Sequence, residues 1–261
     1  MPLNIAIHGA AGRMGQRLVA LAAADKELSL VAAVDAPNHP RQGEDAGLIA
    51  GVQSLGVPLS SDLEGNVDAV VDFSLPPAAE KIIETCRQKK IPLVVATTGL
   101  DEAQMERLPA AVEIPLLWSP NMSLAVNLTM KLAEVAAAAL KDQDADVEIL
   151  ERHHRFKEDS PSGTALKFGR IIADIMGQST HRHGREGRPG QRPHDEIGYH
   201  AIRVGDNPGE HTIVFGVLGE MIELTVRASN RDCYASGALA AAKFLADKPA
   251  GLYGMNDVLG L

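Results

Sequence analysis

A glycine-rich turn between a short apolar strand and a helix constrains the fold more than any other feature of this sequence. The run "LNIAIH" leads directly into "GAAGRMG", which places glycines at Gly9, Gly12 and Gly15. Glycines here let the backbone turn sharply, admit a pyrophosphate to the backbone amides and allow close packing of helix on strand. Asp35 follows about 20 residues later, at the end of the next predicted strand, where it can accept hydrogen bonds from a ribose. The pattern predicts a dinucleotide-binding turn; the alternative is a plain strand–helix turn with a solvent-facing Asp35.

Short continuous apolar strands alternate with helices over the first half of the chain. This alternation predicts an α/β domain of the Rossmann type, with a doubly wound parallel sheet. The polar segment 36–62 reads as loop with some local helix. The predicted strands cover residues 3–8, 28–35, 68–73, 91–99 and 114–121, and the predicted helices cover 14–24, 77–90 and 101–108.

After an Ala-rich helix predicted at 124–141, the strands lie close together without helices between most of them. This predicts a second, α+β domain with a mostly antiparallel sheet. We expect the last helix to pack on the first domain, so that residues 1–124 and 232–261 form a dinucleotide-binding domain and 125–231 a substrate-binding and oligomerisation domain. The predicted elements are strands at 146–152, 197–204, 211–218 and 221–228, helices at 164–177 and 234–248, and a polar loop at 178–196.

Composition excludes several classes of protein. The formal charge of −9 over 261 residues and a pI near 5.5 argue against a nucleic-acid binder, which needs a basic face. No apolar run reaches the roughly 18–20 residues of a membrane span. Cys86 and Cys233 are too far apart in sequence to suggest a disulfide framework or a cysteine metal site. Without a recognisable secretory leader, the expected location is the cytoplasm.

The carboxyl ends of the later predicted strands carry small or polar residues. They read "DFS" at 72–74, "ATTG" at 96–99 and "SPNMS" at 119–123. Ligands of open α/β sheets lie outside the carboxyl ends of the strands, so we expect these segments to surround the nicotinamide half of a cofactor. The alternative for each segment alone is ordinary helix capping by Ser, Thr and Asn.

Asp35 also bears on cofactor choice. A carboxylate beside the ribose repels the additional phosphate of NADP, and no basic side chain stands immediately after Asp35. The sequence therefore predicts a preference for NADH over NADPH. Basic residues nearby can soften that preference: Arg13, His39 and Arg41.

The stretch "ERHHRFKEDSPSGTA", residues 151–165, admits three interpretations: a metal site, a solvated charged face or an anion-binding site. Adjacent His153 and His154 on a strand point to opposite faces and cannot easily share one ion, so we expect no metal. A solvated face does not explain "SPSGTA", which reads as a helix N-terminus whose free amides favour an anion. With Lys157 close by, the stretch predicts a pocket for a small anionic substrate beside titratable side chains.

This stretch, extended to "VEILERHHRFKEDSPSGTA", resembles the signature of the 4-hydroxy-tetrahydrodipicolinate reductase (dihydrodipicolinate reductase) family of lysine and diaminopimelate biosynthesis. The resemblance continues through "GAAGRMG", "SPNMSLAVN", "REGRPGQR" and "IRVGDNPGEHTIVF". It implies NAD(P)H-dependent reduction of a small cyclic dicarboxylate, a dinucleotide-binding domain joined to a tetramerising α+β domain, and no nucleic-acid or membrane partner. The alternatives are another NAD(P)-dependent reductase of a small anionic substrate and a non-catalytic NAD-binding sensor.

The resemblance also implies roles for individual residues. His153 would be the proton donor, and Lys157 a second proton donor that also binds substrate. The residues implied to contact the substrate carboxylate are His154, Gly163 and Thr164. Those implied to bind the cofactor are Gly9, Ala10, Ala11, Gly12, Arg13, Met14 and Asp35 for the adenosine diphosphate half, and Ala96, Thr97, Thr98, Pro120, Asn121, Met122 and Ser123 for the nicotinamide side.

Overall fold

The computed structural model describes residues 1–100, 104 and 113–261 and divides the chain into two compact units. The first contains Met1–Leu124 and Arg231–Leu261, and the second contains Ala125–Asn230. Arg231, which the sequence analysis assigned to the second domain, lies with the first unit. Apart from Gln104, the helix predicted at 101–108 lies outside the described residues.

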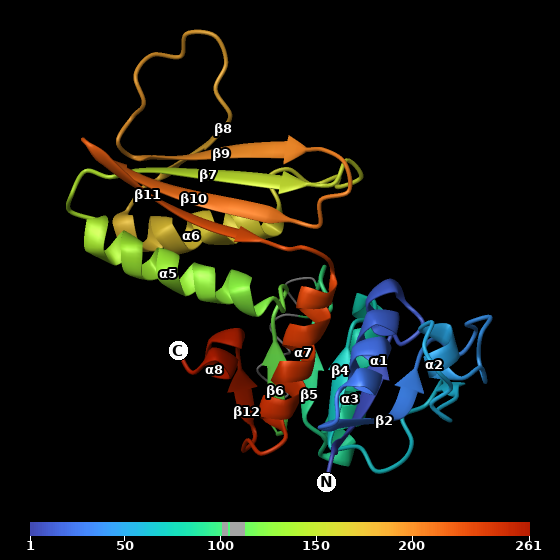
Figure 1. Ribbon diagram of the computed structural model, residues 1–261. Coiled ribbons are helices and arrows are strands. Elements are labelled where there is room, and N and C mark those ends of the chain that lie inside the picture. The colour runs from blue at the N-terminus through green and yellow to red at the C-terminus, as the bar shows by residue number, and fades with distance from the viewer. Residues whose placement is uncertain (101–103, 105–112) are drawn as a thin grey trace. The chain divides into compact units, whose positions relative to one another are not determined.

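A parallel sheet forms the centre of the first unit, which confirms the predicted doubly wound α/β fold (Figure 1). The strand order is β12-β6-β5-β4-β1-β2-β3, and β1 lies between β2 and β4, where the direction of winding reverses. In open α/β sheets the ligand crevice opens at the carboxyl ends of the strands at this reversal. The strands are β1 (Leu3–His8), β2 (Leu28–Val34), β3 (Leu59–Ser60), β4 (Ala69–Asp72), β5 (Leu93–Val95), β6 (Pro115–Trp118) and β12 (Gly251–Tyr253).

Helices cover both faces of this sheet. On one face, α1 packs against β1 and β2, and α7 packs against β4, β5 and β6, in a core that includes Leu18, Ala238 and Ile7. On the other face, α3 packs through Ile82 and Cys86. The return of α7 confirms that the last long helix packs on the first domain. The helices of this unit are α1 (Arg13–Ala24), α2 (Ala46–Ile49), α3 (Pro76–Lys89), α7 (Asp232–Leu245) and α8 (Met255–Leu259).

A mixed sheet in the order β11-β10-β7-β9-β8 forms the second unit, with α5 and α6 on one face (Figure 1). The β7–β10 and β10–β11 pairs are antiparallel, as predicted, but β7–β9 and β8–β9 are parallel. The parallel half arises because α6 carries the chain back across the sheet before β8, and the loop of residues 184–195 carries it back again before β9. These elements are α5 (Leu124–Leu140), β7 (Asp146–His153), α6 (Gly163–Met176), β8 (Thr180–His183), β9 (Glu196–Arg203), β10 (Glu210–Val217) and β11 (Glu220–Arg227).

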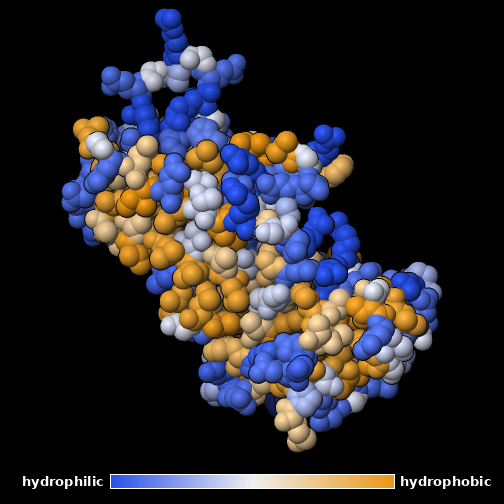
Figure 2. Space-filling view, in the orientation of Figure 1, coloured by the Kyte–Doolittle hydropathy of each residue, from blue (hydrophilic) through white to orange (hydrophobic). Residues whose placement is uncertain are grey.

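Two strands correct the sequence prediction. β8 lies inside the segment predicted as a polar loop; it is exposed along its length and is held by pairing with β9. β12 adds a strand beside β6 where none was predicted. Neither has the buried apolar run by which strands are recognised. The loop between β8 and β9, which projects in Figure 1, is hydrophilic over its surface in Figure 2. None of the described helices combines the length and apolar character that crossing a membrane requires.

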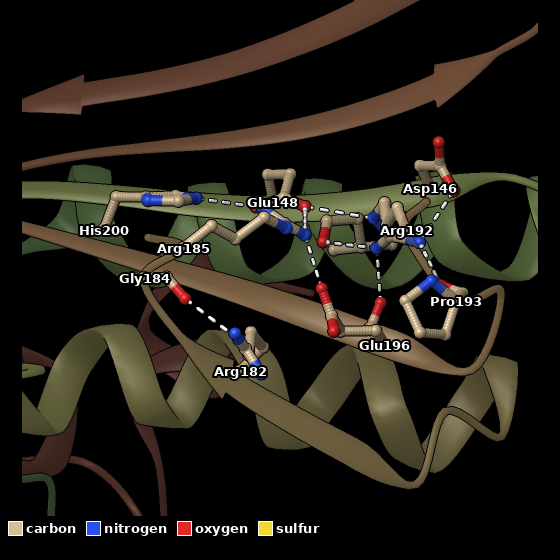
Figure 3. A network of polar contacts seen from close by, with 10 residues as sticks. Asp146, Glu148, Arg182, Gly184, Arg185, Arg192, Pro193, Glu196 and His200 are labelled. Carbon is tan, nitrogen blue, oxygen red and sulfur yellow. Dashed lines mark hydrogen bonds and ion pairs between the residues drawn. The ribbon is translucent and has the colours of Figure 1, made fainter. Parts of the chain in front are cut away.

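The sheet face opposite α5 and α6 carries an ion-pair network centred on Glu148 (Figure 3). Glu148 Oε1 accepts from Arg185 Nη2 at 2.6 Å and from Arg192 Nε at 3.0 Å, and Oε2 lies 2.7 Å from His200 Nε2. Burial alone would raise the pKa of Glu148, but these donors lower it to about 2. The network therefore holds the basic loop between β8 and β9 against β7.

Candidate functional site

The glycine-rich turn has the close packing that a dinucleotide site needs. Gly9 has φ +78°, and a Cβ there would lie 2.7 Å from the carbonyl oxygen of Phe73. A Cβ on Gly15 would lie 2.0 Å from the carbonyl oxygen of Gly9. Both clashes are with backbone, so a side chain at either position would push α1 or β4 away from the turn.

The start of α1 offers free backbone donors above this turn. The N-cap is Gly12, which has no side chain to cap the helix, and the first amides of a helix have no partner within it. The turn is fixed by Asp35, whose Oδ2 accepts from the Ala11 amide at 2.9 Å and whose Oδ1 accepts from the Ala36 amide at 2.8 Å. Each carboxylate oxygen retains a further acceptor site for a sugar hydroxyl.

A cavity of about 1170 Å³ opens beside the turn, and its walls belong entirely to the first unit. Arg13 and His39 line it near Asp35, whereas Arg41 does not and instead pairs with Glu44 at 2.7 Å. Volume, glycine packing and free helix amides together fit a dinucleotide. The predicted cofactor residues that line the cavity are Gly9, Ala11, Gly12, Arg13, Met14 and Asp35; Ala10 is buried behind them.

The ends of β4 and β5 are joined by a polar cluster around Asp72. This fully buried carboxylate lies 2.7 Å from His8 Nδ1 and accepts from the Thr97 hydroxyl at 2.6 Å. Thr97 Oγ1 also lies 3.2 Å from the carbonyl oxygen of Ser74. The residues predicted for the nicotinamide side do not line the cavity described above: Ala96, Thr97, Met122 and Ser123 are buried, and Thr98, Pro120 and Asn121 are partly or fully exposed.

In the second unit, the histidine-rich stretch connects the end of β7 to the start of α6. His153 is the last residue of β7 and is 7% exposed. The backbone after it is fixed by the loop between β9 and β10: the His154 amide donates to the carbonyl of Asn207 at 2.8 Å, and the Arg155 amide donates to that of Gly205 at 3.0 Å. The two histidines are therefore held rigidly beside the helix start.

A buried carboxylate holds the ring of His153. Glu151, 1% exposed, contacts His153 Nδ1 and accepts two bonds from Arg203, Nη1 to Oε2 at 2.8 Å and Nη2 to Oε1 at 2.7 Å. Burial alone would raise the pKa of Glu151, but the bonds from His153 and Arg203 lower it to about 2. Sequence reasoning missed Glu151 as a site residue. The signal was its position two residues before His153, which places both side chains on one face of a strand.

Lys157 and the start of α6 lie beside this pair in sequence and share a carboxylate. Lys157 Nζ lies 2.7 Å from Asp159 Oδ1. Burial would raise the pKa of Asp159, but Lys157 and the Gly163 amide lower it. The helix is capped by Ser162, whose Oγ accepts from the Ala165 amide at 3.2 Å. Apart from its two chain neighbours and the nearby backbone of α6, no described atom lies within 4 Å of where a Cβ on Gly163 would stand.

A third histidine, His211 on β10, completes the cluster and was not predicted. It is 4% exposed, packs edge-on to His153 with ring centroids 5.2 Å apart, and its Nε2 lies 3.1 Å from Ser162 Oγ. Burial lowers the pKa of His211 to about 4, with a further contribution from His153. No local pattern in the sequence could have found it, because β10 reaches β7 only through sheet pairing.

In the described part of the chain, no group of three or more His, Cys, Asp or Glu side chains is arranged to hold a metal ion. His181 and His183 on β8 pack against the ring of Tyr199.

Comparison with known proteins covers the whole chain. Residues 3–122 match the family model described as dihydrodipicolinate reductase, N-terminus, and residues 125–259 match that described as dihydrodipicolinate reductase, C-terminus. A 4-hydroxy-tetrahydrodipicolinate reductase of Rhodopirellula baltica is 59% identical over all of this chain and 97% of its own length. Another from Alkalilimnicola ehrlichii is 48% identical, covering each chain completely.

A solved structure described as dipicolinate-bound dihydrodipicolinate reductase from Paenisporosarcina sp. TG-14 superposes with a TM-score of 0.78. It is 26% identical to this chain, covering 97% of this chain and 98% of its own. An aspartate semialdehyde dehydrogenase from Vibrio cholerae, 12% identical with a TM-score of 0.54, shares the fold alone, covering 92% of this chain and 96% of its own.

Proposed function

The chain belongs to the dihydrodipicolinate reductase family, and from this premise we propose that it reduces 4-hydroxy-tetrahydrodipicolinate to tetrahydrodipicolinate in lysine and diaminopimelate biosynthesis. It is an oxidoreductase with a Rossmann-type NAD(P)-binding fold. The observation that carries the proposal is the grouping of His153, Lys157 and the start of α6, in a chain whose other unit has a dinucleotide turn.

Substrate binding is assigned to the start of α6 and the residues before it. The start of a helix favours a carboxylate, and the Gly163 amide already donates to one, that of Asp159. The space beside Gly163 leaves room for a substrate carboxylate, which Gly163 and Thr164 would contact. Lys157 would exchange Asp159 for the substrate carboxylate, and His154 would contact the same group. The dipicolinate-bound relative supports a dicarboxylate ligand.

The proton is assigned to His153, because an imidazole ring can carry a proton on one nitrogen while the other is held by a partner. Its Nδ1 is held by Glu151, so Nε2 would be the atom that transfers a proton to the substrate ring. Lys157 would fix the orientation of the ring by its carboxylate and assist as a second donor. A reduced nicotinamide dinucleotide, when bound, supplies the hydride.

NADH is proposed as the preferred cofactor. The Asp35 carboxylate stands at the cavity wall, where it would accept bonds from a ribose and repel a phosphate. Arg13 and His39 line the same cavity, which supports residual use of NADPH. The first amides of α1 would hold the pyrophosphate, and residues 96–98 and 120–123 would line the nicotinamide side.

Assembly as a homotetramer is proposed through the sheet face that α5 and α6 leave uncovered. Exposed Ile202 and Met221 lie on strands of this sheet. A sheet face without covering helices offers a flat surface on which a second copy of the chain can pack. Light scattering coupled to size exclusion would give four times the monomer mass. Cys86 and Cys233, the two cysteines of the chain, form no disulfide, which supports a location in the reducing cytoplasm.

The test of the proposed reaction is a coupled assay in which a preceding synthase makes the substrate from aspartate semialdehyde and pyruvate. Loss of NADH or NADPH absorbance that requires all components supports the proposal. Equal oxidation without pyruvate would indicate direct reduction of the semialdehyde, and tight NADH binding without turnover would indicate a sensor; either result contradicts it.

A further inference from the structure

The contact between Glu151 and His153 is a candidate for a role in proton transfer as well as in structure. Residues two apart on a strand point to the same face, and here that face lies toward α6. Glu151 is among the most buried charged residues described, at 1% exposed. Burying a carboxylate costs folding free energy unless its oxygens accept hydrogen bonds, so the partners of Glu151 indicate its role.

All four acceptor positions of the Glu151 carboxylate are used. Oε1 accepts from Arg203 Nη2 and from the Ser162 amide at 3.1 Å, while Oε2 accepts from Arg203 Nη1 and contacts His153 Nδ1. Arg203 pairs with His153 in the β7–β9 register, and this position lets both Nη atoms of its guanidinium group reach the Glu151 carboxylate. A protonated acid could not accept all four bonds.

This arrangement makes Glu151 an acceptor only. With its pKa lowered to about 2, after the opposing effect of burial, the carboxylate stays ionised throughout the working range of an enzyme. It therefore cannot store or deliver the catalytic proton. The hydrogen between Glu151 and His153 must belong to Nδ1 of the ring, whether the imidazole is neutral or charged.

We propose that Glu151 is a positioning residue that locks His153 in the tautomer whose Nε2 gains and loses the proton. The inference deepens the proposed function, on which it rests. The substrate loses its 4-hydroxyl group and a ring hydrogen as water, and a bound reduced nicotinamide would supply the hydride to the unsaturated ring that results. His153 as imidazolium gives its Nε2 proton to the neighbouring ring carbon and becomes the neutral Nδ1–H form; solvent then returns a proton to Nε2.

Two further contacts keep the ring in this orientation. Among the described residues, Nε2 of His153 makes no hydrogen bond, so only Nδ1 is anchored. His211 packs edge-on against the ring at an interplanar angle of 75° and stays neutral, since burial lowers its pKa to about 4. A ring flip would replace the bond to Glu151 with contact between the carboxylate and a C–H group.

The first experiment needs no variant. The wild-type chain, labelled with ¹⁵N in its histidine rings, is assigned by comparison with His153→Gln, and the His153 nitrogens are recorded above the pH at which the ring becomes neutral. We expect Nδ1 to carry the proton and Nε2 to have the shift of an unprotonated nitrogen. A neutral His153 with its proton on Nε2 would overturn the inference.

The second experiment is kinetic, with Glu151→Gln. An amide cannot satisfy Arg203 and His153 together, so we expect kcat to fall between about 10-fold and 1000-fold, part of the ~10²–10⁴-fold that a positioned acid contributes. The dissociation constants of NADH and of pyridine-2,6-dicarboxylate should stay within about twofold, because Glu151 touches neither ligand. Glu151→Asp, which keeps the charge, should recover part of kcat.

The outcomes distinguish the role of Glu151 from the role of His153 as the proton donor. A wild-type kcat in Glu151→Gln, with His153→Gln inactive, would overturn the role of Glu151 alone. Equal losses of kcat and inhibitor affinity in Glu151→Gln would mark Glu151 as structural and also overturn it. Normal turnover in His153→Gln would remove the acid itself and with it the proposed mechanism. If Glu151→Gln does not fold, the wild-type nitrogen shifts decide.

Discussion

The buried His211 should make the stability of the second unit fall as the solution becomes mildly acidic. Its pKa lies at about 4 in the folded chain, against the usual 6.5 of a histidine, because burial disfavours the charged ring. The folded state therefore binds fewer protons than the unfolded state between these values, so stability is full above about pH 6.5 and is lost as pH falls toward about 4. The proposed perturbation is His211→Gln, whose amide oxygen can still accept from Ser162.

The size of the effect follows from the shift. Lowering the pKa of His211 from 6.5 to about 4 corresponds to a free energy of unfolding of roughly 3 kcal/mol. Between pH 7.5 and pH 5, most of the unfolded-state titration is complete, which gives a loss of about 2 kcal/mol. Glu151, with its pKa at about 2, loses only a few tenths of a kcal/mol above pH 5, so it does not mask the histidine.

Peptide-resolved hydrogen exchange on the full chain measures this loss of stability in the second unit. Wild type and His211→Gln are compared at the same pH, so that intrinsic exchange rates cancel, and the amides of β7 and β10 report the opening free energy of the second unit. The advantage of wild type over His211→Gln should shrink by about 2 kcal/mol from pH 7.5 to pH 5. An advantage that stays constant within about 0.5 kcal/mol would refute the claim that burial holds His211 neutral.

Three further predictions concern the two binding regions. Gly15→Ala should destabilise the first unit by about 1–3 kcal/mol and weaken NADH binding, because its Cβ would lie 2.0 Å from the Gly9 carbonyl oxygen. The control is Gly254→Ala, whose Cβ would lie 3.9 Å from the nearest atom, and calorimetry compares the stability and NADH affinity of the two variants. Asp159→Asn should lower the inhibition constant of pyridine-2,6-dicarboxylate about threefold, because it releases Lys157 from an ion pair at the surface. A higher inhibition constant in the variant would contradict this prediction. Asp35→Ser should raise the ratio of NADPH to NADH efficiency about tenfold, or about 1.4 kcal/mol, in steady-state kinetics; an unchanged ratio would exclude Asp35 from cofactor choice.

The sequence predicted those parts of the fold that depend on local pattern. The strand, glycine turn and helix at 3–24 carry their own signals, as do the apolar runs of β4, β5 and β6 and the capped start of α6 at Ser162. The whole-chain resemblance to a known family was confirmed by the family models and the identical residues of the relatives.

What the sequence did not predict depends on partners distant in the chain. β8 is a strand only because β9 pairs with it, and β12 only because β6 does. Glu151 lies next to the histidines in the sequence, but its role depends on its hydrogen bonds from Arg203, which lies 52 residues further on. His211 reaches His153 through the antiparallel pairing of β7 with β10. Such neighbours have no local periodicity to reveal them.

The most direct test of the central claim is the turnover of His153→Gln in the coupled assay, with NADH affinity measured on the same preparation. A positioned general acid contributes about 10²–10⁴-fold, so kcat should fall by at least about 100-fold while the dissociation constant of NADH stays within about twofold. A variant that turns over at close to the wild-type rate would contradict the account.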